Sequence, residues 1–484
     1  MMMKKLPLAI YAMVIGAFAV GADEFIVAGV VQEISEALSV TIGAVGLFES
    51  AYAIGVAVGA PLFTVLGLRI PRRQMLLLSI GVFVVGNLLS ALGPTYSVIM
   101  AGRLVAATAH GAFLGIAALY AGDLVDPERK GRAIALVFSG LTAATVLGAP
   151  MGAAVGRALG WRFTFWSLVI LGGIALVALV ALLPRRTAAE ATTKAHGHDD
   201  PHGHADPHAA HAVAHGDPHG DHGDTHEDTH GDAHGHGGDD LELDAHARMH
   251  MAQEGHRAPL GEQIKALGRP PVWLGLLMTL LSYGGVFTSY VYLAPQLTEV
   301  TGFSGAWITP LFLLFGVGLF VGNAIGGRLA DRSLMPAVLL TVGSLVVMLF
   351  AMNLAILTPA TAVVGIFLYG AAAFSVVAPL QLRIVTKAAD APDVASAANI
   401  SAFTLGSALG IWLGGLAIDG GLGIASVNWV GGLISLSGLA LALVTWLWVD
   451  RRYPDFSHGD AHHGEAHAGR SLPPTGWQPT KGER

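Results

Sequence analysis

The sequence contains no cysteine and few charged residues. Of its 484 residues only 13% are Asp, Glu, Lys or Arg, whereas soluble domains have about 25%. The absence of cysteine excludes a disulfide scaffold, a thiolate metal site and a cysteine nucleophile. The shortage of charge means that most of the surface must lie outside water. We find no nucleotide-binding glycine loop and no catalytic cluster in a soluble segment. We therefore predict that the protein is not an enzyme, and nothing indicates nucleic acid as a partner.

Long apolar segments occupy most of the chain. Hydrophobic residues make up 53% of it, and its 63 glycines suit helices that pack closely in lipid. A bilayer core about 30 Å thick needs roughly 20 apolar residues for each helix that crosses it. Twelve segments meet this requirement: 6–30, 44–66, 74–94, 96–122, 132–158, 162–183, 271–293, 304–328, 334–355, 359–383, 394–417 and 427–449. The first is too long for the apolar core of a signal peptide, so we predict a retained helix.

These segments fall into two groups of six. We predict an N-terminal six-helix bundle (1–183), a His/Asp-rich loop (184–270), a C-terminal six-helix bundle (271–450) and a His-containing tail (451–484). Basic residues gather in the short loops on the side of the N-terminus, among them Arg72, Arg73, Arg129, Lys130, Arg185, Arg186, Arg328, Arg332, Arg383 and Lys387. By the positive-inside rule, both termini and the His/Asp-rich loop are cytoplasmic. We expect a multi-pass protein of the inner (plasma) membrane.

The turn after the second segment of each group carries similar residues. In the C-terminal group it is Gly326-Gly327-Arg328-Leu329-Ala330-Asp331-Arg332, and in the N-terminal group it is Gly67-Leu68-Arg69-Ile70-Pro71-Arg72-Arg73. Glycine lets a helix end in a tight turn, and an acid–base pair can hold neighbouring helix ends in one conformation. The candidate conformational residues are therefore Gly327, Asp331, Arg332, Arg72 and Arg73.

The doubled turn resembles the loop signature of the major facilitator superfamily, whose fold is built from two similar halves. Within 132–158, Gly140-Leu-Thr-Ala-Ala-Thr-Val-Leu-Gly148-Ala-Pro150-Met-Gly152 is similar to the glycine–proline antiporter motif of drug and sugar exporters in that family. Arg103 with His110-Gly111 resembles its intramembrane-arginine motif. Three further stretches resemble the arabinose-efflux and chloramphenicol-exporter branch, of the drug:H⁺ antiporter type: Gly21-Ala-Asp-Glu-Phe25, Gln381-Leu-Arg383 and Ser396-Ala-Ala-Asn399-Ile-Ser-Ala-Phe403.

This resemblance implies an all-α integral membrane fold of twelve transmembrane helices in two pseudo-symmetric six-helix bundles. It also implies a monomeric secondary transporter with no required cofactor. Such a transporter exports a small organic compound, a drug or a sugar, in exchange for protons by alternating access. The sequence departs from the family at Pro71, where the N-terminal loop motif has aspartate, so a latch in that half needs another acid. An ordinary kinked membrane helix is the alternative interpretation of the glycine–proline run.

Four N-terminal segments place a polar residue at a similar depth: Glu24, Glu49, Asn87 and Arg103. At about 1.5 Å per residue, all four lie roughly 8–10 Å below the external surface. Ionisable residues within a span usually mark a transport pathway. We hypothesise that Glu24 is the proton-coupling carboxylate and Arg103 its partner, with Glu49 and Asn87 in the substrate cavity. Asp23 points roughly 100° away from Glu24. A structural ion pair is the alternative interpretation.

His110 is the only histidine within the predicted spans, two turns from Arg103 on nearly the same face. Because histidine changes charge near neutral pH, it could pass protons inward; a packed, hydrogen-bonded side chain is the alternative. The C-terminal group supplies candidate substrate contacts at Tyr283, Phe287, Tyr290, Asn399 and Phe403. Aromatic side chains with a few polar groups suit an amphipathic organic molecule, and they equally suit helix packing.

Sixteen of the 21 histidines lie between His196 and His256, among Asp, Gly and Pro. We predict disorder there, because no apolar periodicity supports a core. His-Gly-His occurs three times, and its imidazoles suit weakly bound zinc, nickel or cobalt: His196, His198, His202, His204, His234 and His236. The loop could buffer or sense metal for an exporter of another compound, serve as a solvated linker, or feed a divalent-metal efflux pore. A membrane-anchored metal buffer or sensor is a further alternative. A metal path is disfavoured, because the predicted spans offer no cysteine and one histidine.

Overall fold

The computed structural model describes residues 6–67, 70–126, 129–184, 268–388 and 391–450, and every regular element in these ranges is a helix. The N-terminal half contains α1 (Leu8–Ile26), η1 (Val27–Gly29), α2 (Val31–Leu38), α3 (Ile42–Gly67), α4 (Arg72–Leu92), α5 (Tyr96–Asp123), α6 (Lys130–Leu159) and α7 (Trp161–Leu182). Most of the His/Asp-rich loop, the tail and all six predicted metal-ligating histidines lie outside the described residues.

The C-terminal half begins with α11 (Pro270–Tyr290), α12 (Leu293–Pro295), η3 (Gln296–Val300), η4 (Gly305–Trp307) and α13 (Ile308–Arg332). It continues with α14 (Leu334–Ala355), α15 (Pro359–Ser375), α16 (Val377–Lys387), α17 (Pro392–Ala417), η5 (Ile418–Leu422), α18 (Ser426–Val444) and η6 (Thr445–Asp450). Proline stands in the first turn of α11, α15 and α17, where its fixed φ suits the helix and its missing N–H is not needed. Gly160, at a φ of 99°, allows the tight turn between α6 and α7.

Twelve helical stretches of the described residues are long and apolar enough to cross a bilayer, as predicted. One predicted boundary is wrong, because Gly326 and Gly327 do not end a helix. Instead α13 continues through both glycines to Arg332. A Cβ atom on Gly326 would lie 2.1 Å from the Ser375 carbonyl oxygen, so this glycine serves the close packing of α13 against α15.

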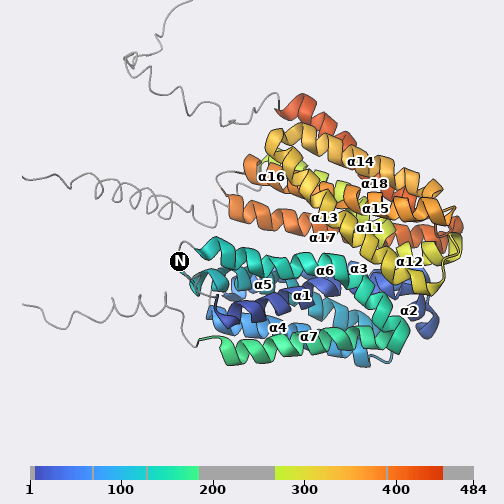
Figure 1. Cartoon of the computed structure of the whole chain (residues 1–484). Coiled ribbons are helices and arrows are strands. Elements are labelled where there is room, and N and C mark those ends of the chain that lie inside the picture. The colour runs from blue at the N-terminus through green and yellow to red at the C-terminus, as the bar shows by residue number, and fades with distance from the viewer. Residues whose placement is uncertain (1–5, 68–69, 127–128, 185–267, 389–390, 451–484) are drawn as a thin grey trace, which may run out of the picture.

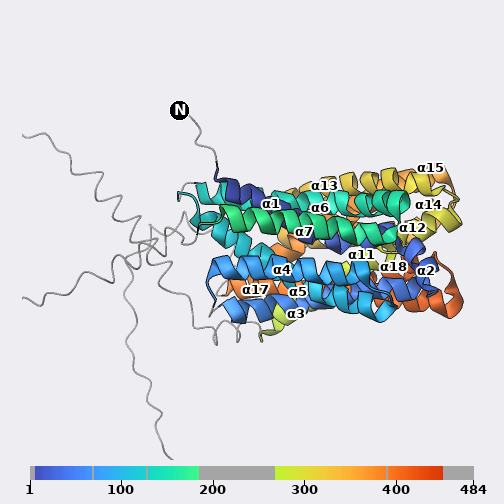
Figure 2. The same cartoon turned by 90° about the horizontal axis from the view of Figure 1, so that it is seen from below.

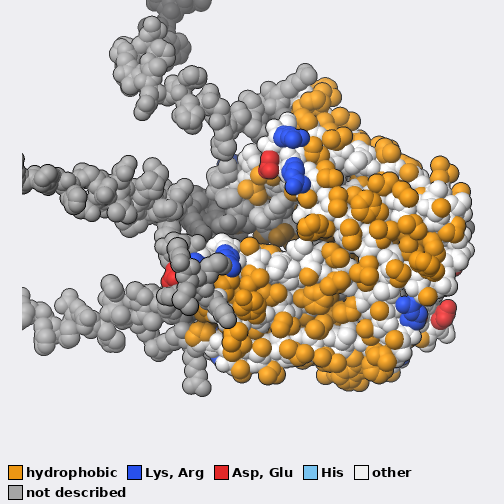
Figure 3. All heavy atoms as spheres, viewed as in Figure 1, with side chains coloured by type: hydrophobic (Ala, Val, Ile, Leu, Met, Phe, Trp, Pro, Cys, Tyr) orange, Lys and Arg blue, Asp and Glu red, His pale blue; other side chains and the backbone are white. Residues whose placement is uncertain are grey.

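The helices form two bundles that lie side by side, α1 to α7 and α11 to α18 (Figure 1). The long helices of both run between the same two ends of the molecule (Figure 2). We call the end where α1 begins and α7 ends the terminus end, and the end with α2 and α12 the distal end. Hydrophobic side chains cover much of the outer face, which suits a surface in lipid (Figure 3).

Polar contacts join the two halves at the distal end. The Thr41 hydroxyl donates to Asp419 at 3.0 Å, and the Thr298 hydroxyl donates to the Gln32 side-chain oxygen at 3.0 Å. Arg157 of α6 donates to the Gly305 carbonyl and, at 3.1 Å, to the Thr309 hydroxyl. These contacts hold the halves together around α2 and the distal ends of α3, α6 and α17.

The halves separate toward the terminus end (Figure 1). Helices α6 and α13 approach closely at Gly316, where a Cβ atom would lie 2.8 Å from the Val146 backbone. Beyond it lies an open, mainly apolar groove of about 660 Å³. Seven residues of α6 between Ala135 and Leu147 line it, together with Phe320 of α13. The structure is therefore closed at the distal end and parted at the terminus end along this interface.

Candidate functional site

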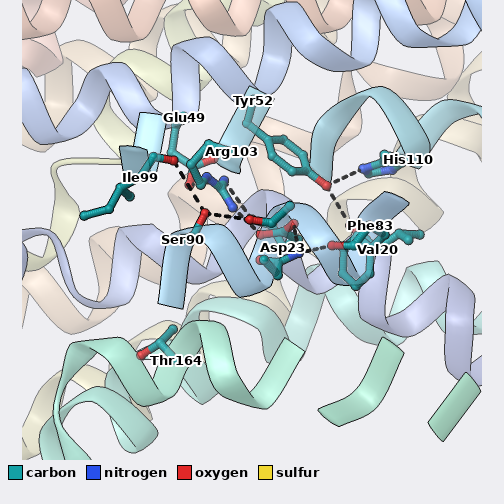
Figure 4. A network of polar contacts seen from close by, with 12 residues as sticks. Val20, Asp23, Glu49, Tyr52, Phe83, Ser90, Ile99, Arg103, His110 and Thr164 are labelled. Carbon is teal, nitrogen blue, oxygen red and sulfur yellow. Dashed lines mark hydrogen bonds and ion pairs between the residues drawn. The ribbon is translucent and has the colours of Figure 1, made fainter. Parts of the chain in front are cut away.

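A buried ion-pair network joins three helices of the N-terminal half (Figure 4). Arg103 of α5 forms an ion pair with the Asp23 carboxylate of α1, and it donates to the Asp23 carbonyl at 3.0 Å. The same guanidinium donates to the Glu49 carboxylate of α3 at 2.7 Å. The side chains of Arg103 and Asp23 are 0% exposed and that of Glu49 is 3% exposed. Charges this deeply buried are costly unless they are paired or neutralised.

Helix α4 supports the network through Asn87. Its side-chain amide donates to the second Asp23 carboxylate oxygen at 2.9 Å and to the Phe83 carbonyl at 3.2 Å. Both Asp23 carboxylate oxygens therefore accept hydrogen bonds, whereas Glu49 has one contact with Arg103. Glu49 and Asn87, predicted for the substrate cavity, are instead members of the buried network.

The prediction that Arg103 pairs with Glu24 is wrong in this structure. Asp23 is the α1 residue that faces α5, and Glu24 lies about 100° further around the helix. Glu24 is partly buried. Its carboxyl interacts electrostatically with Arg103 and Asp23, without an ion pair to Arg103, and also with Tyr283 and Tyr290 of the C-terminal half. Asp23 therefore forms the ion pair with Arg103, whereas Glu24 lies beside this pair and also interacts with the opposite half.

Tyr52 of α3 is a member of the network that the sequence did not reveal. Its ring lies beneath the Arg103 guanidinium, with the Arg103 Cζ atom 4.3 Å from the ring centroid. Its hydroxyl donates to the Val20 carbonyl at 3.0 Å and lies 3.0 Å from the Nδ1 atom of His110 (Figure 4). The sequence feature that could have identified Tyr52 is its position three residues after Glu49, because this spacing places both side chains on one face of the helix.

An aromatic cluster in the C-terminal half meets α1 across the interface. Tyr283, Phe287 and Tyr290 follow one another along α11, and Phe25 of α1 lies 6.1 Å from the Phe287 ring and 5.9 Å from the Tyr290 ring. Phe403 of α17 extends the cluster, 4.7 Å from the Tyr283 ring. The structure therefore brings together four of the five predicted substrate contacts of this half, next to the helix turn that carries Glu24.

Asn399, the fifth predicted substrate contact, is fully buried. Its side-chain amide donates to Gln381 of α16 at 2.7 Å, and Gln381 donates to Ser396 at 2.7 Å. This hydrogen bond joins α17 to α16. No group of three or more His, Asp or Glu side chains within the described ranges is arranged to hold a metal ion.

The glycines of the glycine–proline run bring α6 against α1. A Cβ atom on Gly152 would lie 2.1 Å from the Ile26 carbonyl oxygen, and one on Gly148 would lie 2.9 Å from the Phe25 Cβ atom. Pro150 is buried between them inside α6. These residues set the distance between α6 and the helix that carries Asp23 and Glu24.

The two loop motifs differ in the structure. Arg72 pairs with Asp123 of α5 at 2.5 Å, which supplies the acid that Pro71 does not provide. Arg73 donates to the Val180 carbonyl of α7 at 3.4 Å. In the C-terminal half, Asp331 and Arg332 are exposed at the end of α13, and Gly327 has nothing within 4 Å of a built Cβ atom.

Known proteins resemble this chain in sequence and in fold. Residues 13–411 match the family model of the Major Facilitator Superfamily. The chain is 32% identical over 423 residues to the inner membrane transport protein YdhP of Escherichia coli (strain K12), covering 87% of this chain and 92% of that protein. It is 31% identical over 407 residues to a chloramphenicol resistance protein of Streptomyces lividans, covering 84% of this chain and 88% of that protein.

A solved structure is similar over almost the whole chain. The D-xylose-proton symporter superposes with a TM-score of 0.63 at 15% sequence identity, covering 90% of this chain and 96% of that chain. At this identity the likeness concerns the fold, two six-helix bundles around an interface. The predicted resemblance and fold class are both confirmed. The chain belongs to the major facilitator superfamily and is a multi-pass membrane transporter, not an enzyme.

Proposed function

We propose that the protein exports small organic compounds, drugs or sugars, across the inner membrane in exchange for protons. The observation that carries this proposal is the composition of the buried network. One guanidinium, Arg103, faces two carboxylates, Asp23 and Glu49. With all three groups charged, one negative charge is left uncompensated in an apolar environment, which is costly. A bound proton removes that excess, so the network offers a place for one proton in one conformation and its release in another.

Glu24 connects this proton to the substrate. It is the carboxyl of α1 that Arg103 does not hold directly, and it interacts with Tyr283 and Tyr290 of the opposite half. Aromatic rings beside a single carboxyl suit an amphipathic organic molecule with one polar or cationic group. Because Glu24 also interacts electrostatically with Arg103 and Asp23, substrate bound beside Glu24 would favour release of the proton from the network, which couples export of one to entry of the other.

The shape of the molecule supports alternating access. The distal contacts and the terminus-end separation represent one of the two states that such a transporter needs. The distribution of Lys and Arg orients the terminus end toward the cytoplasm, so this state is open to the inside. The protein would act as a monomer, with the bilayer, protons and the small molecule as its partners.

Transport by the purified protein in liposomes tests the proposal. With chloramphenicol as the first probe and arabinose as the second, a pH gradient across the vesicle should drive uptake of at least one. Glu24→Gln and Asp23→Asn should abolish gradient-driven uptake, whereas Glu36→Gln, which removes an exposed carboxyl of α2, should not. Gradient-dependent uptake that persists in Glu24→Gln would remove this residue from the coupling mechanism.

A growth panel separates organic export from the metal alternatives. Efflux-deficient cells would express the full chain or a chain that lacks 196–256, in the presence of drugs, toxic sugars, or zinc, nickel and cobalt salts. Drug or sugar tolerance that survives the deletion would support the proposal, with the His/Asp-rich loop as an accessory. Metal tolerance that disappears with the loop would replace it by divalent-metal efflux.

A further inference from the structure

The hydroxyl of Tyr52 lies between α1 and α5 and holds both. It has a single proton, which it donates to the Val20 carbonyl at 3.0 Å. The His110 Nδ1 atom, also 3.0 Å away, must then be the donor of the second hydrogen bond. His110 therefore carries a proton on Nδ1, and its contact with Tyr52 needs no change of charge.

The Tyr52 ring forms one wall of the Arg103 site. The guanidinium uses its N–H groups on Asp23 and Glu49 and rests its face on this ring, with the Arg103 Cζ atom 4.3 Å from the centroid. Phe165 of α7 lies 5.9 Å from the same atom. The charged and titratable groups around Tyr52 are Asp23, Glu24, Glu49, Arg103 and His110.

The hydrogen bond to the Val20 carbonyl connects Tyr52 to α1. This carbonyl belongs to the turn of α1 that leads to Asp23 and Glu24, one turn further along. The Tyr52 hydroxyl therefore fixes the ring to α1 one turn before the two carboxyls. Because His110 lies on α5 together with Arg103, the ring is tied to both partners of the ion pair.

We propose that Tyr52 is a positioning residue for proton coupling, and that the Nδ1–H donor of His110 holds its ring in place beneath Arg103. Val20 and His110 fix the hydroxyl, the ring supports the guanidinium, and the guanidinium stays on Asp23 and Glu49. His110 acts through this hydrogen bond and does not carry the transported proton. The role in coupling rests on the proposed function, whereas the effect on the carboxyls does not.

An infrared titration of the protonated-carboxyl band in the purified protein tests the positioning directly, without a substrate. In Tyr52→Leu and His110→Leu the guanidinium loses support, so it opposes protonation of the carboxyls less. The titration midpoint should then move to higher pH by about one unit, the order of one cation–π contact. His110→Asn places an amide N–H near the position of Nδ1, and its midpoint should stay within about 0.3 units of wild type.

Folding and transport controls separate the possible failures. All variants would first be compared by thermal unfolding in detergent, with Tyr52→Phe as the variant that keeps the ring and removes only the hydroxyl. Tyr52→Phe should shift the midpoint less than Tyr52→Leu. An unmoved midpoint in a folded Tyr52→Leu protein, or equal shifts in His110→Asn and His110→Leu, would overturn the proposal. Absence of pH-driven chloramphenicol or arabinose transport in wild type would instead count against the proposed function alone.

Discussion

The guanidinium of Arg72, at the start of α4, lies 2.5 Å from the carboxylate of Asp123, at the end of α5. Pro71 precedes α4 as its N-cap residue, so the acid comes from the neighbouring helix and not from the loop. The Arg72 side chain is 53% exposed and that of Asp123 is 19% exposed. Such a pair stabilises a protein by about 0.2–1 kcal/mol. Its importance therefore lies in holding two helix ends in one conformation.

Asp123→Asn should slow transport while leaving the unfolding temperature nearly unchanged, because the pair contributes little to the total stability. Arg72→Asp should have a similar effect. Combining Arg72→Asp with Asp123→Arg restores the ion pair with its two charges exchanged, and this double variant should recover most of the transport rate. Uptake in liposomes and thermal unfolding measure the two effects. A double variant as slow as the single ones would show that the pair itself is unimportant.

Gly152→Ala should destabilise the protein and impair transport. The added Cβ atom would lie 2.1 Å from the Ile26 carbonyl oxygen, so α1 and α6 must move apart. Overpacking of this kind typically costs about 1–3 kcal/mol. Gly173→Ala in α7 is the matched control, because nothing lies within 4 Å of its built Cβ atom. Equal unfolding temperatures for the two variants would contradict the close α1–α6 contact.

The sequence was sufficient for the helices but not for all their contacts. Apolar length sets the spans, because the bilayer imposes the same requirement on each. The positions of Glu49, Asn87 and Arg103 along their predicted spans likewise predicted that these polar residues lie at one depth in the membrane. The partner of Arg103 depends instead on the rotation of α1 about its axis, where one residue amounts to about 100°. Packing against α5 and α6 decides that rotation, which no local pattern records.

Tyr52 and Gly326 illustrate the same limit in different ways. A tyrosine in an apolar run has the same appearance whether it packs in a core or supports an ion pair, so only its neighbours Arg103 and His110 reveal its position. Gly326 stood in a motif that suggested a helix end, yet its close contact with Ser375 explains it as a packing residue. The role of each residue is set by a neighbouring helix that is distant from it in the sequence.

The distal end offers a direct test of alternating access. Because the chain has no cysteine, a pair introduced as Gln32→Cys and Thr298→Cys would be its only thiols. The side chains of Gln32 and Thr298 are hydrogen-bonded at 3.0 Å across the two halves. Because cysteine is shorter than glutamine, a short bis-methanethiosulfonate linker should join the two thiols and stop transport, and a reducing agent, which cleaves its disulfides, should restore it. Each single variant serves as a control, and full transport by the cross-linked protein would argue against opening at this end.

Arg103 allows the stability of the network to be separated from its role in transport. Arg103→Gln leaves Asp23 and Glu49 buried without a positive partner, and breaking a buried pair in this way typically costs about 3–5 kcal/mol. Arg132→Gln, at an exposed position of α6, should have little effect on the unfolding temperature. Adding Asp23→Asn and Glu49→Gln to Arg103→Gln removes the unpaired charges, so much of the lost stability should return. Gradient-driven uptake should not return, because no group remains in the network to exchange a proton. A triple variant that still couples uptake to the pH gradient would place the proton site elsewhere, with Glu24 as the next carboxyl to test.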